Sequence, residues 1–397
     1  MTRLSTVVCL ATGLFASAAP APRVEPAPPP LTPDNVAKLQ PVGEIPIDGW
    51  ELFWGPKGGE FSILQWLGPV DVLDAKTFKP LRKIAADRQL AHIAFARGGD
   101  LVAWSDNLTK QVEITELSTG KARKIDVGGT QADVRFTPDG KFLATGAYGK
   151  QATLWNVDTG EKVRTFDTDT DGGLRVVFTG DGTKLALSNR NSTTSIYEVA
   201  TGKLLHELPR RMTQEVRFNP GGTLLAAAYV DGTVGLWDVA TGKSLHERAT
   251  GGKEVYSLDW SPKGDLLATS GLEGKIIVWD PKELKPLKEL DAPEWVIQVR
   301  FSPDGSRLFT AGGTALRSPD RKVTVWGIKD QDNTRLLGAT VSIGTGFSAG
   351  DVLTAVTKPG ITKSYDAATG VLTLTGNATI ATYLVVLKSV RFSTPLA

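Results

Sequence analysis

The sequence predicts an all-β protein whose main part is a seven-bladed β-propeller, a ring of seven four-stranded sheets. Seven aromatic residues recur at intervals of 41, 41, 42, 40, 42 and 41 residues, namely Trp54, Phe95, Phe136, Phe178, Phe218, Trp260 and Phe301. A second column follows nineteen residues after each of the first six, at Leu73, Ile114, Trp155, Tyr197, Trp237 and Trp279. A period near forty indicates a supersecondary unit copied seven times.

Turn residues separate four short apolar stretches in each unit. Thr137–Gly140 reads Thr-Pro-Asp-Gly and follows a first-column aromatic, whereas Asp158–Gly160 reads Asp-Thr-Gly and follows the second column. Pro fixes φ, Asp bonds its own backbone and Gly accepts a positive φ, so both are turns. In the seventh unit an insertion around Ala315–Asp320 delays Trp326 by six residues.

The fifth unit shows the four predicted strands most clearly. Glu215–Phe218 alternates between polar and apolar residues, and Leu224–Tyr229 is short and apolar. Asp231-Gly232 is a hairpin dipeptide that leads into Val234–Asp238, and Lys243–Glu247 forms a more polar outer strand. Four short antiparallel strands make one propeller blade.

These residues resemble the repeats of the WD-repeat β-propeller family over about residues 39–328. The strongest units are Phe136–Asp158, Phe218–Val239, Trp260–Asp280 and Phe301–Trp326, which carry the turn and end in an aliphatic residue followed by Trp. The resemblance implies that an N-terminal strand completes the last blade, and Leu39–Ile47 is the predicted strand. Closure of the ring removes exposed sheet edges.

The sequence also departs from the family pattern. The Gly-His dipeptide that precedes the first strand of each family repeat is absent, so the His–Ser/Thr–Asp–Trp hydrogen-bond network that the resemblance implies is incomplete. Parts of it are expected in blade 5, with Asp231 and Trp237, and in blade 6, with Trp279 and either Thr269 or Ser270. We therefore expect apolar packing between blades to stabilise the ring.

The two ends of the chain differ from the ring. Residues 1–18 combine one positive charge, a short apolar run and Ala16-Ser17-Ala18, which predicts a signal peptide. Residues 19–38 are rich in Pro and predict an extended linker. Residues 329–397 form a small Thr/Val/Gly-rich β segment, in which residues 331–394 resemble a cadherin-like repeat of bacterial surface proteins. We expect this segment to attach the protein to an envelope structure or another subunit.

Composition favours an exported protein without a nucleic-acid partner. The formal net charge is +2 and no block of Lys or Arg stands out beyond Arg210-Arg211, which argues against dedicated nucleic-acid binding. The one cysteine, Cys9, lies in the predicted signal peptide, so the mature chain has no disulfide or thiol nucleophile. We expect a periplasmic, cell-surface or secreted location in a bacterial envelope, with no transmembrane segment in the mature chain.

Motifs of catalysis are missing from the sequence. His206 and His246 lie on predicted outer strands, and His92 has no second His or Cys near it for zinc. We find no nucleophile elbow, zinc-protease motif or phosphate-binding glycine loop. The sequence therefore predicts no catalytic residues, no metal, no cofactor and no enzymatic activity.

Two surfaces could bind a ligand or partner. Arg135, Arg217 and Arg300 stand one residue before their column aromatics and could ring a channel that attracts an anion. Alternatively, their stems pack between blades and their charges pair with carboxylates, which is the interpretation that we favour.

The second surface is one rim of the ring, where outer strands connect to the next blade. The predicted partner-binding residues, a type enriched in binding hot spots, are Trp50, Tyr148, Arg210, Arg211, Tyr229, Tyr256 and Trp295. Alternatively, these aromatic side chains only plug the mouth of the channel.

The sequence predicts a non-catalytic scaffold that binds a protein or peptide partner. One alternative is a propeller enzyme or small-anion binder that uses the central channel, which a bound metal would favour. The other is a cell-surface adhesion protein in which the C-terminal segment dominates. The sequence leaves the oligomeric state open.

Overall fold

The structure is a computed structural model that describes residues 28–393 with gaps. The gaps are residues 46, 48–50, 56–58, 66–67, 85–89, 97–98, 107–109, 130, 169–172, 189–192, 210, 293–294, 314–321, 328–334, 343–351, 357, 369–370, 380–384 and 387–388. The predicted signal peptide and the first part of the Pro-rich segment lie outside the described residues.

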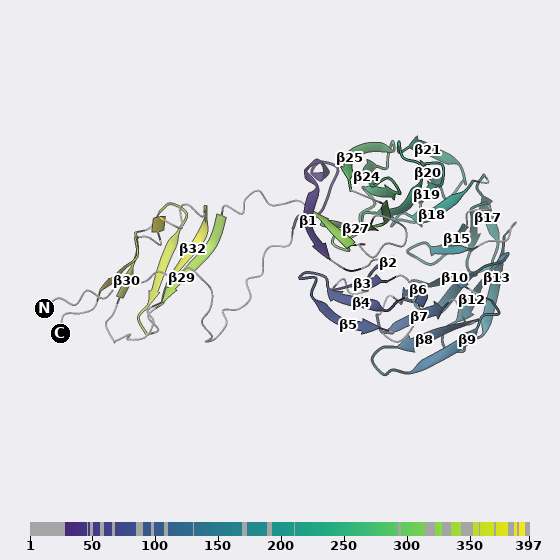
Figure 1. Cartoon of the computed structure of the whole chain (residues 1–397), viewed down its shortest axis with the longest axis horizontal. Helices are drawn as coiled ribbons and strands as arrows, with labels where there is room; N and C mark the ends of the chain where they lie inside the picture. The colour runs from purple at the N-terminus through teal and green to yellow at the C-terminus, as the bar shows by residue number, and fades with distance from the viewer. Residues whose placement is uncertain are drawn as a thin grey trace.

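Seven four-stranded antiparallel sheets surround a central axis, which confirms the predicted seven-bladed propeller (Figure 1). The strands of blade 1 are β2 (Glu51–Trp54), β3 (Glu60–Leu64), β4 (Val70–Asp74) and β5 (Pro80–Ile84). Those of blade 2 are β6 (Leu90–Phe95), β7 (Leu101–Asp106), β8 (Gln111–Glu116) and β9 (Ala122–Asp126). Those of blade 3 are β10 (Gln131–Phe136), β11 (Phe142–Ala147), β12 (Gln151–Asn156) and β13 (Lys162–Asp167).

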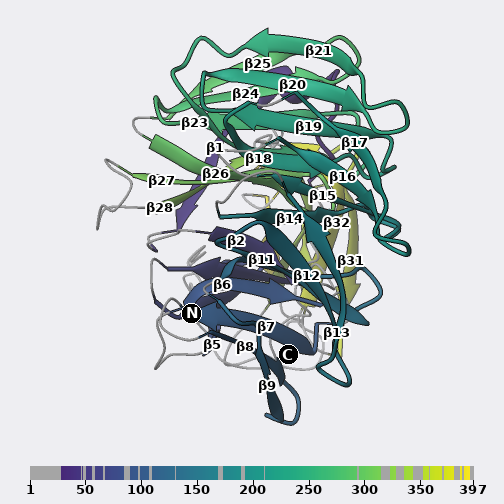
Figure 2. The same cartoon turned by 90° about the vertical axis from the view of Figure 1, so that its right-hand side faces the viewer.

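The next three blades repeat this order. Blade 4 contains β14 (Arg175–Phe178), β15 (Lys184–Ser188), β16 (Ser195–Glu198) and β17 (Leu204–Glu207). Blade 5 contains β18 (Thr213–Phe218), β19 (Leu224–Tyr229), β20 (Thr233–Asp238) and β21 (Ser244–Ala249). Blade 6 contains β22 (Val255–Trp260), β23 (Leu267–Gly271), β24 (Lys275–Asp280) and β25 (Lys285–Asp291). Figure 2 shows β21, β20, β19 and β18 in order from the outside of the ring inward.

Blade 7 is built from both ends of the ring, as the sequence predicts. It contains β26 (Trp295–Phe301), β27 (Arg307–Gly313) and β28 (Lys322–Gly327), and its outer strand is β1 (Gln40–Ile45). Gln40 pairs with Gly327 and Ile45 with Val323 in an antiparallel register. The N-terminal strand therefore closes the ring.

The buried apolar side chains gather between neighbouring blades. Among the described residues, one cluster lies at each of the seven blade junctions. At the junction of blades 5 and 6, for example, Trp260 and Trp279 pack with Val234 and Leu236. Side chains alternate between the two faces of a strand, so each sheet contributes one face to each of two junctions.

The predicted turns have the expected backbone. Gly140 has φ of 72° and Gly160 has φ of 76°, in the left-handed region that glycine adopts without a steric cost. In the first turn the hydroxyl of Thr137 donates to Asp139 at 2.6 Å, and the amide of Gly140 donates to the Thr137 carbonyl at 2.8 Å. Repetition of these turns places equivalent residues of successive blades at equivalent points of the ring.

The last part of the predicted linker packs against the ring. Leu31 is 2 % exposed, and Val36, in the short 3-10 helix η1 (Val36–Lys38), is fully buried at the junction of blades 6 and 7. The amide of Leu31 donates to the carbonyl of Gly305 in blade 7 at 2.8 Å. Composition indicated an extended segment, but it could not show that Leu31 and Val36 have apolar partners.

The C-terminal region forms a small β unit. A three-stranded sheet has the order β29 (Arg335–Ser342), β32 (Val371–Thr379) and β31 (Thr362–Asp366), and β30 (Val352–Thr354) pairs with β33 (Arg391–Ser393). A cluster of apolar residues that includes Leu353, Leu372 and Leu374 is buried among these strands. The cadherin-like resemblance of this region stays a prediction.

Candidate partner-binding site

The first strands of neighbouring blades contact one another around the central axis, as β6 does with β10 and β22 with β26. Because the strands within a blade are antiparallel, the second-to-third and blade-to-blade connections lie at one end of the ring. We call this end the rim.

The structure places the described rim residues in different environments. Tyr148 follows β11 and is 67 % exposed, and Met212 precedes β18 and is 53 % exposed. Trp295 begins β26 and is partly buried. Tyr256 is also partly buried, at a β-bulge between Val255 and Ser257. Bulges redirect a side chain relative to its strand. Trp50 and Arg210 lie outside the described residues.

Arg211 and Tyr229 contact each other on blade 5. The Arg211 guanidinium lies 4.0 Å from the centroid of the Tyr229 ring, and it also pairs with Asp231 at 2.6 Å and with Glu247 at 2.9 Å. Tyr229 is 3 % exposed, and its hydroxyl accepts a hydrogen bond from Trp237 Nε1 at 2.9 Å. Burial raises the pKa of Tyr229 to about 12, although the Trp237 hydrogen bond and Arg211 oppose the shift. This packing leaves little of the Tyr229 ring for a partner to contact.

A ring of polar residues stands three positions before the column aromatics. We call these seven residues the inner ring: Glu51, His92, Asp133, Arg175, Glu215, Ser257 and Gln298. From the sequence we predicted a channel site only at the position one before the aromatic. The signal that could have found the inner ring is the same period, because a polar residue occupies the position three before the aromatic in all seven units.

The inner ring connects one blade to the next by hydrogen bonds. In four blades its side chain accepts the amide of the residue two before the next column aromatic. The bonds run from Val176 N to Asp133 at 3.0 Å, from Leu258 N to Glu215 at 3.1 Å, from Val299 N to Ser257 at 3.3 Å and from Leu52 N to Gln298 at 3.3 Å. These amides are buried, and a buried amide without an acceptor is costly. The inner ring therefore supplies acceptors between neighbouring blades.

The three predicted channel arginines pair with these carboxylates. Arg135 lies 3.2 Å from both Glu51 and Asp133. The Glu215 carboxylate lies 2.7 Å from the Arg217 guanidinium and 3.0 Å from the Arg300 guanidinium. This pairing reduces the positive potential that would attract an anion, although the anion site itself stays a prediction.

Glu215 is the most heavily bonded member of the inner ring. It is 9 % exposed, and it accepts the Ser257 hydroxyl at 2.7 Å in addition to the arginines and the Leu258 amide. Burial by itself raises the pKa of Glu215, but Arg300, Arg217 and Arg175 outweigh this effect and hold the pKa well below its usual range. Glu215 is therefore ionised and joins blades 5, 6 and 7.

For Asp259 and His92, unlike Glu215, desolvation outweighs the neighbouring charges. Desolvation raises the pKa of Asp259, although Arg300 and Arg217 counteract it. Desolvation lowers the pKa of His92, although Asp133 and Glu51 counteract it.

The other two histidines lie on outer strands. His206 on β17 contacts the Ala240 carbonyl at 3.0 Å, and His246 lies on β21.

No group of three or more His, Cys, Asp or Glu residues in the described part of the chain could hold a metal ion. None of the helices in that part is long and apolar enough to cross a membrane.

Comparison with known proteins identifies the repeat. A family model described as WD domain, G-beta repeat matches residues 129–156, 213–238, 242–280 and 284–327. These are blades 3, 5, 6 and 7, the units that carry both the turn and the terminal Trp. The β-propeller domain of Cps50 (Swd1) from Myceliophteria thermophila superposes with a TM-score of 0.61 at 14 % identity, covering 73 % of this chain and 100 % of that one. Four of the seven blades therefore match the WD repeat, and the ring has the β-propeller fold.

Curated relatives match parts of this chain. The WD repeat-containing protein SL1-17 of Schistosoma mansoni is 31 % identical over 126 residues, which are 30 % of this chain and 40 % of the relative. THO complex subunit 3 of Arabidopsis thaliana is 23 % identical over 181 residues, 45 % of this chain and 57 % of the relative. A periodic tryptophan protein 2 homolog of Dictyostelium discoideum is 24 % identical over 139 residues, 34 % of this chain and 15 % of the relative. The chain thus spans only part of each relative.

Three second-column tryptophans use two kinds of hydrogen-bond arrangement. In blade 6, Trp279 Nε1 donates to Thr269 at 2.9 Å, which decides between the predicted partners Thr269 and Ser270. In blade 5, Trp237 donates to Tyr229, whereas Asp231 pairs with Arg211, so the two residues expected there have partners outside the family network. In blade 3, Trp155 donates to Thr145 at 3.0 Å, a pair that the sequence argument missed.

Proposed function

We propose that this WD-repeat propeller is a non-catalytic scaffold that binds a protein partner through its rim. The observation that carries the proposal is the exposure of Tyr148. At 67 % it is the most exposed large apolar side chain among the described residues. Aromatic residues at interfaces supply a large contact area with little conformational entropy to lose.

Neighbouring features of the rim support this choice. Met212 is 53 % exposed at the same end of the ring, and Tyr256 and Trp295 are partly exposed there. Burial of an exposed side chain of this size contributes about 1.5–3 kcal/mol to binding before the costs of association. Several such side chains at one end of a rigid ring could support a specific contact.

The comparisons support the class of function. WD-repeat propellers are generally non-catalytic scaffolds, and one of the relatives is by name a subunit of a complex. In the channel, each of the three predicted arginines has a carboxylate partner. The scaffold function therefore agrees better with the geometry than anion binding or catalysis does.

We also propose that the protein is exported to a bacterial envelope or beyond it. The support is the pattern of residues 1–18 and the Pro-rich composition that follows. The test is the mass of the N-terminal peptide of the protein recovered from each cell fraction. A chain that begins at residue 19 in an envelope or secreted fraction supports export, and a chain that retains Met1 in the cytoplasm contradicts it.

Cross-linking with matched variants tests the rim. The mature protein, a Tyr148→Ser/Met212→Ser variant and a Leu81→Ser/Leu245→Ser control are cross-linked in the native cell fraction, and the captured proteins are identified. Leu81 and Leu245 are 52 % and 47 % exposed but lie on the outer strands β5 and β21. The control therefore loses comparable exposed apolar surface away from the rim.

The proposal expects a partner that the wild type and the control both capture and the rim variant loses. Thermal melts of all three proteins establish that the variants remain folded. Equal capture by the rim variant and the wild type would exclude this part of the rim as the interface.

A further inference from the structure

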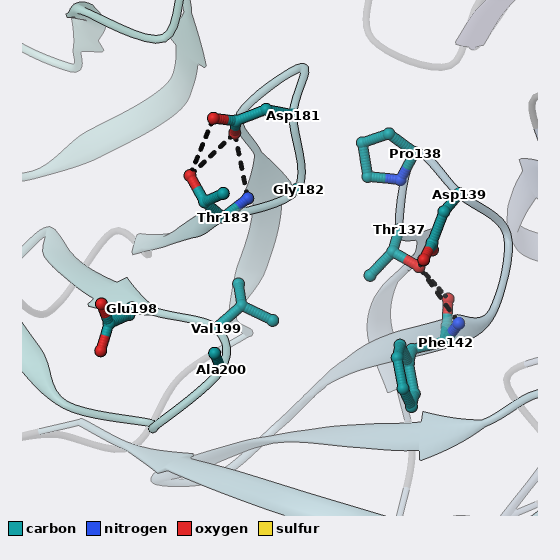
Figure 3. A pocket seen from close by; sticks show the side chains of 10 residues that line it. All are labelled: Thr137, Pro138, Asp139, Phe142, Asp181, Gly182, Thr183, Glu198, Val199 and Ala200. Carbon is teal, nitrogen blue, oxygen red and sulfur yellow. Dashed lines mark hydrogen bonds between the residues drawn. The ribbon is translucent and has the colours of Figure 1, made fainter.

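A groove lies between blades 3 and 4 at the end of the ring opposite the rim. It encloses about 360 Å³. Figure 3 shows its two walls, with Pro138, Asp139 and Phe142 from blade 3 on one side and Asp181, Glu198 and Val199 from blade 4 on the other. Phe142 and Val199 are only partly buried, so the groove presents apolar surface between carboxylates.

The equivalent place between blades 6 and 7 holds a segment of this chain. Both junctions have the same framework, because a Cβ built on Gly182 would lie 3.1 Å from Pro138 Cδ and one on Gly305 would lie 3.4 Å from Pro262 Cδ. Next to the second pair stands Pro30, 4.0 Å from the same built atom. The following residue, Leu31, donates its amide to the Gly305 carbonyl.

The two junctions differ in how deeply the equivalent apolar side chain is buried. Phe142 and Leu266 both stand six residues after their column aromatics, Phe136 and Trp260. Leu266 is fully buried in the cluster that contains Leu31, whereas Phe142 is partly buried. An extended Pro-Leu segment thus covers this position in blade 6, and the blade 3 position offers a larger apolar side chain to a similar segment.

The charges of the two junctions differ. Asp139, Asp181 and Glu198 of the groove correspond to Lys263, Asp304 and Gly327 at the other junction. The Thr137 hydroxyl lowers the pKa of Asp139, and the Thr179 hydroxyl lowers that of Asp181 to about 2, so both are ionised near neutrality. Lys141 and Lys184 lie close enough to act on these two carboxylates, but neither lines the groove. The lining therefore favours a cationic occupant.

We propose that this groove binds an extended peptide of a partner protein that presents a Pro-Leu-like apolar pair beside a lysine or arginine. The apolar pair covers Phe142 and Val199 as Pro30 and Leu31 cover their junction, and the cation lies among the carboxylates. Gly182 lines the groove and corresponds to Gly305, whose carbonyl accepts the Leu31 amide, so we expect the Gly182 carbonyl to accept an amide of the peptide. The proposal deepens the scaffold function proposed above and rests on it.

Titration with two peptides tests the groove. The probes are Lys-Pro-Pro-Leu-Thr-Lys and Glu-Pro-Pro-Leu-Thr-Glu, each labelled and followed by fluorescence anisotropy with the full chain. Asp139→Lys/Glu198→Lys reverses two of the lining charges, one on an exposed turn and one at the end of β16. Glu161→Lys is the matched control, because Glu161 is an exposed carboxylate at the turn between β12 and β13 that does not line the groove.

The expected result is binding of the lysine peptide with a Kd below about 100 μM and at least about tenfold weaker binding of the glutamate peptide. The groove variant is expected to lose at least about tenfold in affinity, and the control to match the wild type. Absence of binding, or equal binding by the groove variant, would overturn the proposal.

Two further measurements separate the alternatives. The rim variant Tyr148→Ser/Met212→Ser is expected to bind the peptide like the wild type, so failure of the rim and failure of the groove are distinguishable. Sedimentation of the wild type and the groove variant reports self-association. The proposal would be overturned if the wild type formed a dimer, the groove variant did not, and both bound the peptide equally. A second copy of the chain would then be the occupant of the groove.

Discussion

Replacement of Glu215 by Gln removes one charge from the centre of the ring and leaves the shape nearly unchanged. The carboxylate accepts from Arg217, Arg300, the Ser257 hydroxyl and the Leu258 amide. A glutamine can still accept through one oxygen, so the contact with Ser257 and Leu258 can persist. The two guanidinium groups, however, lose the anion that both contact.

The expected loss of stability follows from this geometry. Removal of one partner of a buried ion pair costs about 3–5 kcal/mol, because the remaining charge stays desolvated. Arg217 is partly exposed to solvent, whereas the side chain of Arg300 is 7 % exposed, so most of the cost falls on Arg300. Because Gln retains hydrogen bonds, we expect the low end, about 3 kcal/mol, which corresponds to a decrease in Tm of about 6–12 °C.

Chemical denaturation at neutral pH, monitored by tryptophan fluorescence, measures this loss. The control is Glu207→Gln, which removes an exposed carboxylate from the outer strand β17 and is expected to change the free energy of unfolding by less than about 0.5 kcal/mol. A Glu215→Gln variant as stable as this control would refute the assignment of Glu215 as the junction of blades 5, 6 and 7.

The pH dependence of the free energy of unfolding tests the ionisation of Glu215 independently. Because the pKa of Glu215 is lower in the folded than in the unfolded state, its stabilisation is complete above the unfolded value of 4.5 and is lost as pH falls below it. The Glu215→Gln variant should therefore lose less stability than the wild type between neutral pH and about pH 3. Parallel pH profiles for the two proteins would contradict the lowered pKa.

Three further outcomes are expected. Trp279→Ala should lower the free energy of unfolding by about 3–5 kcal/mol, because the side chain is 2 % exposed, and a loss below about 1 kcal/mol in denaturant titration would contradict its place in the core. Leu31→Ala should lower the free energy of unfolding by about 2–4 kcal/mol in the same assay, because Leu31 packs in the apolar cluster between blades 6 and 7. An unchanged denaturation midpoint would contradict this packing. Burial lowers the pKa of His92, so the folded state favours neutral His92 and stability falls as the pH drops below 6.5. His92→Gln should therefore make the free energy of unfolding depend less on pH between pH 6.5 and 5. An equal slope in the wild type and the variant would refute this.

Much of the ring was predictable because its signals are local or periodic. The turn at Gly140 requires a positive φ, and the sequence supplies Pro, Asp and Gly in the order that such a turn uses. The closing strand was predictable because a seventh blade that ends at Trp326 lacks an outer strand and an unassigned strand begins near Leu39. These inferences needed no knowledge of which side chains touch.

The candidate sites were less predictable because contacts decide them. Tyr148 follows β11 and Tyr229 ends β19, the second strands of blades 3 and 5, and both were predicted to contact a partner, yet one is 67 % exposed and the other 3 %. The difference arises because Arg211 and Trp237 both contact Tyr229. Sequence spacing gives the loop in which a tyrosine lies but not the neighbours that cover it.

The sequence by itself determined the number of blades, the order of their strands and the closure of the ring, because these depend on periodicity and turn chemistry within one repeat. Only the tertiary structure decided how repeats differ: which carboxylate joins Arg217 to Arg300, and which junction Leu31 covers. Glu215 and Arg300 are 85 residues apart. The strength of such a pair depends on distance and burial in space, and a linear pattern carries neither quantity.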